Sequence, residues 1–485
     1  MFKTIQDPDL VRDRCLINGT WITAADNATI PVHNPATSEL ITQVPSCSTI
    51  ETRQAITAAF NALPAWRQFP AAKRSHILRT WHDLMLCHQE DLAHIMTLEQ
   101  GKPLNESRGE IKYAAAFLEW FGEEAKRVYG DIIPAPQANR RILVLKEPIG
   151  VCAAITPWNF PAAMLTRKAG AALAAGCTLV AKPASQTPLS ALALGMLAER
   201  AGVPAGVLNI VTGSAKTIGT ELTSNPIVRK LSFTGSTEVG RQLMEQCAPT
   251  IKRLSLELGG NAPFIVFDDA DLDAAVQGAI ASKYRNSGQT CVCANRFLVQ
   301  DKIHDVFAEK LSKAVGELKV GNGLDAGVQQ GPLIDQAAID KVEVLVDDAI
   351  TKGARLIGGG ARHALGGTFY QPTVLANATS KMRVAEEEIF GPVAPLFRFY
   401  DENEAIQMAN ATDYGLAAYF YARDLSRIWR VSEALEYGMV GINTGIISTE
   451  VAPFGGVKQS GLGREGSHYG IDEYLEVKYL NLGDI

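Results

Sequence analysis

The segment from 151 to 247 alternates short apolar runs with stretches of helical spacing, and it constrains the fold more than any other feature. The apolar runs lie at 151–155, 178–181, 207–211 and 230–233. Continuous apolar strands that alternate with helices are typical of a parallel sheet with helices on both faces. Ligands of such a sheet bind beyond the carboxyl ends of its strands, so the loops after these four runs are the candidate binding loops.

Helical spacing precedes this segment, and a second alternation follows it. Apolar residues recur every three or four positions from 49 to about 126, interrupted by Pro70 and Pro103. The stretches 141–146 and 474–480 alternate apolar and polar residues, which predicts half-exposed strands. The second alternation runs from about 262 to 443, and its helices are expected over 270–283, 302–318 and 335–352.

Composition and charge exclude several classes of protein and partner. The chain has 485 residues, 47% hydrophobic and 20% charged, which fits a globular protein of two or three domains at roughly 150 residues each. The net charge of −6, without a dense run of Lys or Arg, predicts no nucleic-acid partner. The most apolar stretch, 169–181, is too short to span a bilayer, and residues 1–10 do not form a signal peptide.

Eight cysteines are scattered along the chain without a CxxC pair. Disulfide frameworks are typical of short secreted chains, so we expect reduced thiols and a cytoplasmic location. Cys291 follows a polar turn that contains Gly288, where a thiolate nucleophile could be exposed and backed by amide donors. The alternative is a small buried apolar residue. No second Cys or His pair accompanies Cys291 and Cys293 at ligand spacing, so we expect no metal.

Glu257 is a lone carboxylate in an apolar stretch, followed by two glycines that let a ligand approach closely. Burial raises a carboxyl pKa into the range of a general base, and the alternative is an ion pair with an arginine. Asn159 lies between Trp158 and Phe160 in the loop after the first strand. Its amide could stabilise an oxyanion or cap a helix.

The loops after the second and fourth runs carry groups that suit a nucleotide. Lys182 and Ser185 supply a cation and a hydroxyl where a Rossmann-like sheet would meet an adenosine ribose. Gly235 and Ser236 precede a helix whose N-terminus could bind phosphate. The G-x-G-x-x-G fingerprint is absent, so these residues alone give only moderate support for a nucleotide.

Together these segments resemble the aldehyde dehydrogenase superfamily, in its order and over nearly the whole chain. Glu388 to Pro392 and Pro453 to Gly456 belong to the same resemblance. Within the superfamily, the chain is similar to bacterial NADP-preferring succinate-semialdehyde dehydrogenases. The stretches that carry this finer similarity are 166–168, 283–286, 291–293 and 453–469.

The resemblance implies a role for each candidate residue. Cys291 is the nucleophile, Glu257 the general base, and the Asn159 amide and the Cys291 backbone amide hold the oxyanion. A substrate carboxylate is expected at Arg167, Arg285 and Ser448. The residues expected to contact NADP, with NAD as a second cofactor, are Thr156, Trp158, Asn159, Lys182, Ser185, Gly235, Ser236, Leu258, Glu388 and Phe390.

The implied fold is α/β and has three parts, a Rossmann-type cofactor domain, an α/β catalytic domain and a small β-arm. The arm is expected to pair between subunits in a homodimer or homotetramer. The expected bounds are 1–126 and 147–257 for the cofactor domain, 258–470 for the catalytic domain, and 127–146 and 471–485 for the arm.

The implied activity is NADP-dependent oxidation of succinate semialdehyde to succinate, and the alternative substrate is glutarate semialdehyde or another ω-carboxy aldehyde. A non-catalytic protein of this fold is disfavoured because Cys291, Glu257 and Asn159 are all present. An acylating enzyme that passes the thioester to CoA is disfavoured because such enzymes usually lack the base equivalent to Glu257. Cys293 is either a redox partner of Cys291 or, as we favour, a small packed residue. Glu221 is a carboxylate that could still reach the ribose and favour NAD.

Overall fold

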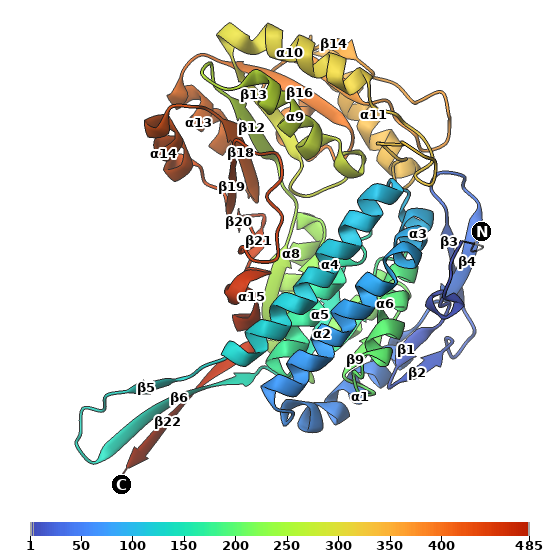
Figure 1. The fold of residues 1–485 in the computed structure, drawn as a ribbon, viewed down its shortest axis with the longest axis vertical. Helices are drawn as coiled ribbons and strands as arrows, with labels where there is room; N and C mark the ends of the chain where they lie inside the picture. The colour runs from blue at the N-terminus through green and yellow to red at the C-terminus, as the bar shows by residue number, and fades with distance from the viewer. Residues whose placement is uncertain (1, 3, 484–485) are drawn as a thin grey trace.

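The computed structural model of the chain describes residue 2 and residues 4–483, which form two large sheets with surrounding helices and a projecting arm (Figure 1). Residues 1, 3, 484 and 485 lie outside the described residues. The signal-peptide prediction for residues 1–10 and the predicted end of the arm at 485 therefore fall partly outside them.

The first sheet has the strand order β2-β1-β9-β8-β7-β10-β11-β21, and the strands from β9 to β11 run parallel. Four of its strands confirm the four predicted apolar runs. The strands are β1 (Cys15–Ile17), β2 (Thr20–Ile22), β7 (Val151–Ile155), β8 (Thr178–Lys182), β9 (Leu208–Ile210), β10 (Val228–Thr234), β11 (Arg253–Glu257) and β21 (Gly461–Leu462).

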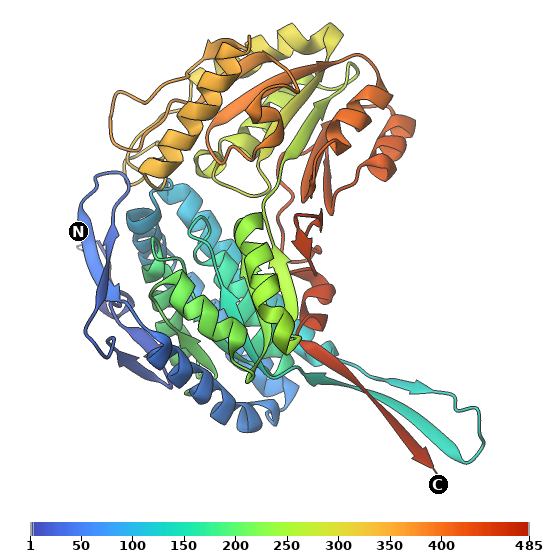
Figure 2. The ribbon, with the colours of Figure 1, turned by 180° about the vertical axis from the view of Figure 1, so that it is seen from behind.

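Helices cover both faces of this sheet, as predicted. Figure 1 shows α2 to α6 over one face, and Figure 2 shows α7 and α8 over the other. Pro70 and Pro103 stand at the N-caps of α2 and α4, because proline ends a helix readily and begins one without loss. The helices are α1 (Thr49–Arg67), α2 (Ala71–Cys87), α3 (Gln89–Gln100), α4 (Leu104–Glu124), α5 (Ala163–Ala175), α6 (Pro188–Arg200), α7 (Ala215–Ser224) and α8 (Thr237–Cys247).

Helix α5 fixes the loop that precedes it, because every residue of α5 is buried. Its alanines and its one glycine, Gly170, let it pack tightly against α4. A Cβ at Gly170 would lie 3.2 Å from the Phe121 ring and 3.3 Å from the carbonyl oxygen of Phe117. The loop between β7 and α5 is therefore held at both ends by the core of the first sheet.

The second sheet has the order β14-β15-β16-β13-β12-β18-β19, with β14 antiparallel to its neighbour. Its strands are β12 (Ala262–Val266), β13 (Ala294–Gln300), β14 (Arg355–Gly358), β15 (Thr373–Ala378), β16 (Val393–Phe399), β18 (Ala417–Tyr421) and β19 (Met439–Ile442). The accompanying helices are α9 (Leu272–Lys283), α10 (Asp301–Gly316), α11 (Gln336–Thr351), α12 (Arg383–Glu386), α13 (Glu402–Asn410) and α14 (Leu425–Ala434).

After β19 the chain returns to the first sheet through β21 and then forms α15 (Ser467–Asp472), which packs against α4 and α5. This return begins before the predicted domain boundary at 470, and the three-part division remains a prediction. Two small pairs of antiparallel strands complete the body: the hairpin of β3 (Thr29–His33) with β4 (Leu40–Pro45), and β17 (Tyr414–Gly415) with β20 (Val457–Lys458), which are far apart in the sequence.

The arm is a three-stranded antiparallel sheet that projects away from the body in both views (Figures 1 and 2). It consists of β5 (Asp131–Ile133), β6 (Arg140–Pro148) and β22 (Leu475–Gly483). β22 pairs with β6 along its whole length. The two strands predicted at 141–146 and 474–480 are confirmed, and within one chain they pair with each other.

Candidate active site

A cavity of about 280 Å³ lies at the carboxyl ends of β7, β10 and β11, next to the loop before β13. It joins residues that are far apart in the sequence, because parallel strands end at one edge of a sheet. Nine of the predicted site residues line it: Trp158, Asn159, Gly235, Ser236, Glu257, Leu258, Cys291, Glu388 and Phe390. The other predicted residues, Thr156, Lys182, Ser185, Arg167, Arg285, Ser448 and Cys293, are not among the residues that line it.

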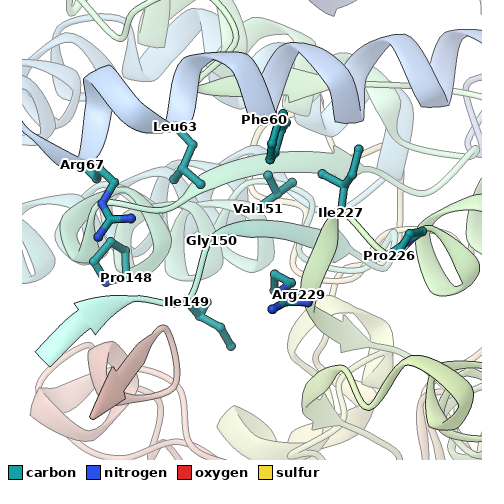
Figure 3. A pocket seen from close by; sticks show the side chains of 10 residues that line it. All are labelled: Phe60, Leu63, Arg67, Pro148, Ile149, Gly150, Val151, Pro226, Ile227 and Arg229. Carbon is teal, nitrogen blue, oxygen red and sulfur yellow. The ribbon is translucent and has the colours of Figure 1, made fainter. Parts of the chain in front are cut away.

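A larger cavity of about 410 Å³ lies at the opposite, amino end of β7 and β10 (Figure 3). It is lined by side chains of α1 and by residues 148–151, 226, 227 and 229, including the cations Arg67 and Arg229. None of its lining residues carries a thiol, a carboxylate or a side-chain amide, in contrast to the cavity that holds Cys291, Glu257 and Asn159.

Cys291 follows a short 3-10 turn over 285–288 in which Asn286 and Ser287 adopt left-handed backbone angles, with φ of 51° and 56°. Such angles are unfavourable for residues other than glycine, so the surrounding contacts must impose them. Burial raises the pKa of the Cys291 thiol to about 12, and the positive charge of Arg167 opposes that rise. Burial of the Cys291 thiol and the charge of Arg167 therefore act in opposite directions on its pKa, and Arg167 favours the thiolate form.

Glu257 is the last residue of β11, and its side chain is buried. Neither carboxylate oxygen has a hydrogen-bond partner among the residues that the structure describes. Burial raises the pKa of Glu257 well above its ordinary value, and the carboxylate of Glu465 adds to the rise, while Arg167 and Lys168 lower it. The ion pair considered from the sequence alone is absent from the described contacts, and the group has the properties of a general base.

Asn159 does not cap the helix that follows its loop, because the N-cap of α5 is Ala162. Its side-chain Nδ2 donates to the carbonyl of Gln289 over 2.9 Å, which uses one of its two hydrogens. Its backbone carbonyl accepts from Lys102 Nζ at 2.7 Å and from Asn286 Nδ2 at 3.0 Å. Sequence reasoning missed Lys102 and Asn286, since nothing in their local sequence indicates a contact with Asn159.

Lys182 ends β8 beside the loop of Thr156, whose backbone N–H donates to the Lys182 carbonyl over 3.1 Å. Burial lowers the pKa of the Lys182 ammonium to about 8. Ser185 Oγ donates to the carbonyl of Gly213 at 3.4 Å. Glu221, the carboxylate that could have favoured NAD, accepts from Arg53 Nε at 3.0 Å and is already paired.

Glu388 and Phe390 also line the cavity, and Phe390 contacts Trp158 of the Asn159 loop. Glu388 Oε1 accepts from the backbone N–H of Gly260 at 3.1 Å, and burial raises the pKa of this carboxyl to about 7. The rings of Trp158 and Phe390 meet edge to face, with centroids 5.6 Å apart. Two aromatic rings and a carboxylate therefore converge at one side of the cavity.

Arg167 lies fully buried on α5, where it forms an ion pair with Glu465 and stacks over the Phe454 ring at 4.5 Å. Its terminal nitrogens Nη1 and Nη2 have no hydrogen-bond partner among the described residues. Arg167, which is predicted to bind the substrate carboxylate, is therefore partly used in an ion pair with Glu465, but its Nη1 and Nη2 donors remain free among the described residues.

Arg285 stands over the Phe160 ring at 5.4 Å, and Ser448 lies in the loop between β19 and β20. Tyr113, which sequence reasoning missed, has a buried hydroxyl without a partner in the described part of the chain. Burial raises the pKa of Tyr113 to about 12, while the charges of Arg167 and Arg285 lower it. A hydroxyl and two guanidinium groups thus gather in one region near Cys291.

Cys293 is buried, and its Sγ donates to the carbonyl of Lys283 at 3.4 Å and to that of Ala294 at 3.5 Å. These contacts suit the packed-residue interpretation, and a redox partnership with Cys291 stays a prediction. Over the described residues, no three His, Cys, Asp or Glu side chains form a group that could hold a metal ion. Among the same residues, no helix is long and apolar enough to cross a membrane.

Comparison with known proteins gives a match to the aldehyde dehydrogenase family over residues 21–480. The chain is 65% identical to a glutarate-semialdehyde dehydrogenase of Pseudomonas aeruginosa, over 99% of this chain and 100% of that protein. It is 66% identical to the NADP(+) succinate-semialdehyde dehydrogenase of Escherichia coli K12, over 99% of each chain. The crystal structure of an NADP-dependent enzyme from E. coli superimposes with a TM-score of 0.98 at 66% identity, covering 99% of this chain and 100% of the other.

Proposed function

Because this chain belongs to the aldehyde dehydrogenase family, we propose that it oxidises succinate semialdehyde to succinate with NADP as the hydride acceptor. The observation that carries the proposal is the single cavity that holds Cys291, Glu257 and Asn159. A thiol, a buried carboxylate and an amide donor are the groups that acyl chemistry through a thioester requires. The alternative substrate, glutarate semialdehyde, is favoured by the 65% identity to the P. aeruginosa protein.

The residues around the cavity suit a dinucleotide. Lys182 is a buried cation whose pKa is shifted by burial, and it would be stabilised by a 2′-phosphate, with Ser185 as a second contact. Gly235 and Ser236 would hold the diphosphate, and Thr156 and Leu258 would be further contacts of the cofactor. Trp158, Glu388 and Phe390 would hold the nicotinamide ribose and ring, because aromatic faces and a carboxylate suit those groups. The bound cofactor supplies a hydride acceptor at the nicotinamide ring.

The side chains of this protein perform the remaining chemistry. The Cys291 thiolate adds to the aldehyde carbon, and the oxyanion accepts from the free N–H of Asn159 and from the Cys291 backbone amide. Both donors are neutral, so they hold the oxyanion without protonating it, and the loss of a hydride then leaves a thioester on Cys291. Ionised Glu257 takes a proton from water, the resulting hydroxide attacks the thioester, and succinate leaves as the thiol re-forms.

The distal carboxylate of the substrate is proposed to bind Arg167, Arg285 and Ser448. Support comes from the free Nη1 and Nη2 of Arg167, since buried guanidinium donors without a partner are unfavourable until an anion reaches them. The proposed specificity is therefore for aldehydes with a carboxylate at the far end.

We also propose that the arm joins subunits into a homodimer or homotetramer. Val477 and Tyr479 on β22 and Ile132 on β5 are apolar side chains exposed by 57–80%, and β22 is an edge strand. A cytoplasmic location is supported by eight cysteines that are all free thiols. A place in the degradation of γ-aminobutyrate follows if succinate semialdehyde is the substrate.

A steady-state comparison tests the substrate and the cofactor together. The kcat/KM of succinate semialdehyde, glutarate semialdehyde and butanal is measured with NADP and with NAD. The proposal expects succinate semialdehyde with NADP to be highest and butanal to be lowest. A higher value for glutarate semialdehyde would select the alternative substrate, equal values for butanal would remove the carboxylate site, and a tenfold preference for NAD would overturn the cofactor.

A further inference from the structure

We propose that Lys102 is a positioning residue that holds Asn159 in place to receive the oxyanion, a role that rests on the proposed function. Lys102 lies between α3 and α4, and its side chain is 1% exposed. Its Nζ contacts the carboxylate of Glu110, the carbonyl of Asn159 at 2.7 Å and the face of the Phe160 ring at 4.1 Å. Lys102 does not line the cavity, so it acts through Asn159 and touches no reacting atom.

Glu110, the ion-pair partner of Lys102, contacts the other end of the same loop. Its Oε1 accepts from the backbone N–H groups of Ala162 at 3.0 Å and Ala163 at 3.2 Å, where α5 begins. The Lys102–Glu110 pair therefore forms hydrogen bonds with the loop backbone at Asn159 and again at Ala162, three residues later. A buried pair whose remaining donors and acceptors are satisfied is rigid, and it fixes the backbone that carries the amide.

Asn286 ties this loop to the loop of the nucleophile. Its Nδ2 donates to the Asn159 carbonyl at 3.0 Å and to the Gln289 carbonyl at 3.2 Å, and Gln100 Nε2 donates to its Oδ1 at 2.9 Å. Asn159 Nδ2 also donates to the Gln289 carbonyl. The Asn159 carbonyl thus accepts hydrogen bonds from Lys102 and from Asn286, which lies in the loop before Cys291. Loss of Lys102 would remove one of these two bonds and let the Asn159 amide move relative to Cys291.

An oxyanion donor works because it is in position before charge develops, so a small displacement lowers the rate without lowering the affinity for cofactor. A residue that only stabilises the fold would lower the thermal midpoint and leave kcat unchanged. If Lys102 positions Asn159, replacing Lys102 should lower kcat in the protein that has Asn159. The same replacement should have no further effect on kcat in a variant that lacks the Asn159 amide.

A double-mutant cycle tests this with Lys102→Met, Asn159→Ala and their combination, measured as kcat, KM for NADP and Tm. Lys252→Met is the matched control, because Lys252 is also buried and its Nζ donates to two backbone carbonyls, Asn225 at 2.7 Å and Val228 at 2.8 Å, at the far end of the sheet. We expect Lys102→Met to lower kcat by roughly ten- to a hundredfold. KM for NADP should change by less than about twofold, and Lys252→Met should lower Tm with little effect on kcat.

The double variant should match Asn159→Ala to within about twofold, because the effect of Lys102 passes through that amide. Losses that multiply, or an unchanged kcat in Lys102→Met, would overturn the inference. If Lys102→Met does not fold because Glu110 is left unpaired, Lys102→Met with Glu110→Gln removes both charges and keeps an acceptor for α5. That variant should show the same loss of kcat, and wild-type kcat in it would also overturn the inference. Failure of the proposed function is distinguishable, since the wild-type protein itself would then show no turnover.

Discussion

The side-chain amide of Asn159 donates to the carbonyl of Gln289 over 2.9 Å, and this bond joins the loop after the first parallel strand to the loop of the nucleophile. Gln289 stands two residues before Cys291, so the proposed oxyanion donor and the thiol share one short connection. The bond holds groups 132 positions apart in the sequence next to each other, as the proposed mechanism requires. The predictions below follow from the groups gathered around that connection.

The first prediction concerns the pH dependence of deacylation. Burial and Glu465 raise the pKa of Glu257 well above its ordinary value of 4.5, and only the ionised form is a base. We expect kcat under deacylation-limited conditions to rise as the pH increases through this raised pKa. The rise should vanish in Glu257→Gln, and a kcat that is flat with pH in the wild type would contradict the assignment.

The raised pKa of Glu257 also predicts that removing this carboxyl group stabilises the folded protein at neutral and higher pH. Between 4.5 and the raised pKa, the folded state holds a proton that the unfolded state releases, so the wild type loses stability as the pH rises. Glu257→Gln should therefore raise Tm at pH 8 by roughly one to a few degrees. Thermal unfolding monitored by circular dichroism is the measurement, and the gain should shrink towards zero as the pH falls to 4.5.

Lys182→Met should weaken NADP more than NAD. The ammonium of Lys182 is buried, and a 2′-phosphate would supply the negative charge that stabilises it. We expect KM for NADP to rise by roughly tenfold or more, which corresponds to one charged hydrogen bond. NAD lacks the phosphate and is the internal control, so an equal rise for both cofactors would place Lys182 outside the phosphate site.

Arg285→Ala should reduce kcat/KM for succinate semialdehyde by some tens-fold to thousands-fold, the equivalent of about 2–5 kcal/mol for a lost charged partner. Butanal should lose much less, because it has no carboxylate. Arg67→Ala is the matched control, since Arg67 lines the cavity at the opposite end of the sheet (Figure 3). Equal losses for both aldehydes would mean that Arg285 holds the catalytic loop and does not bind the carboxylate.

Much of this architecture could be predicted from the sequence, and the exceptions have a common cause. Strands β7, β8 and β10 were expected at 151–155, 178–181 and 230–233, because a run of apolar residues between turns is a local signal. Their parallel arrangement then brings Asn159 and the residues after Thr234 to one edge.

Contacts between polar side chains that are far apart in the sequence leave no local sequence pattern from which they could be predicted. Lys102 contacts Asn159 across 57 positions, and Glu465, which pairs with Arg167 and Lys168, lies on the return of the chain to the first sheet, 297 positions after Lys168. Each of these residues has an ordinary sequence context, and only the packing of α4, α5 and the 461–472 stretch brings them together. The free donors of Arg167 and the hydroxyl of Tyr113 depend on the same packing.

The central claim is that substrate passes through a thioester on Cys291 whose hydrolysis needs Glu257. Its most direct test is rapid mixing of Glu257→Gln with succinate semialdehyde and NADP, followed by intact-protein mass spectrometry, with Cys291→Ala as the control. The account predicts a burst of NADPH stoichiometric with the enzyme, then a stall, with one succinyl group on Cys291 and none on the control. Uniform slowing of turnover, without a burst and without an acylated Cys291, would contradict it.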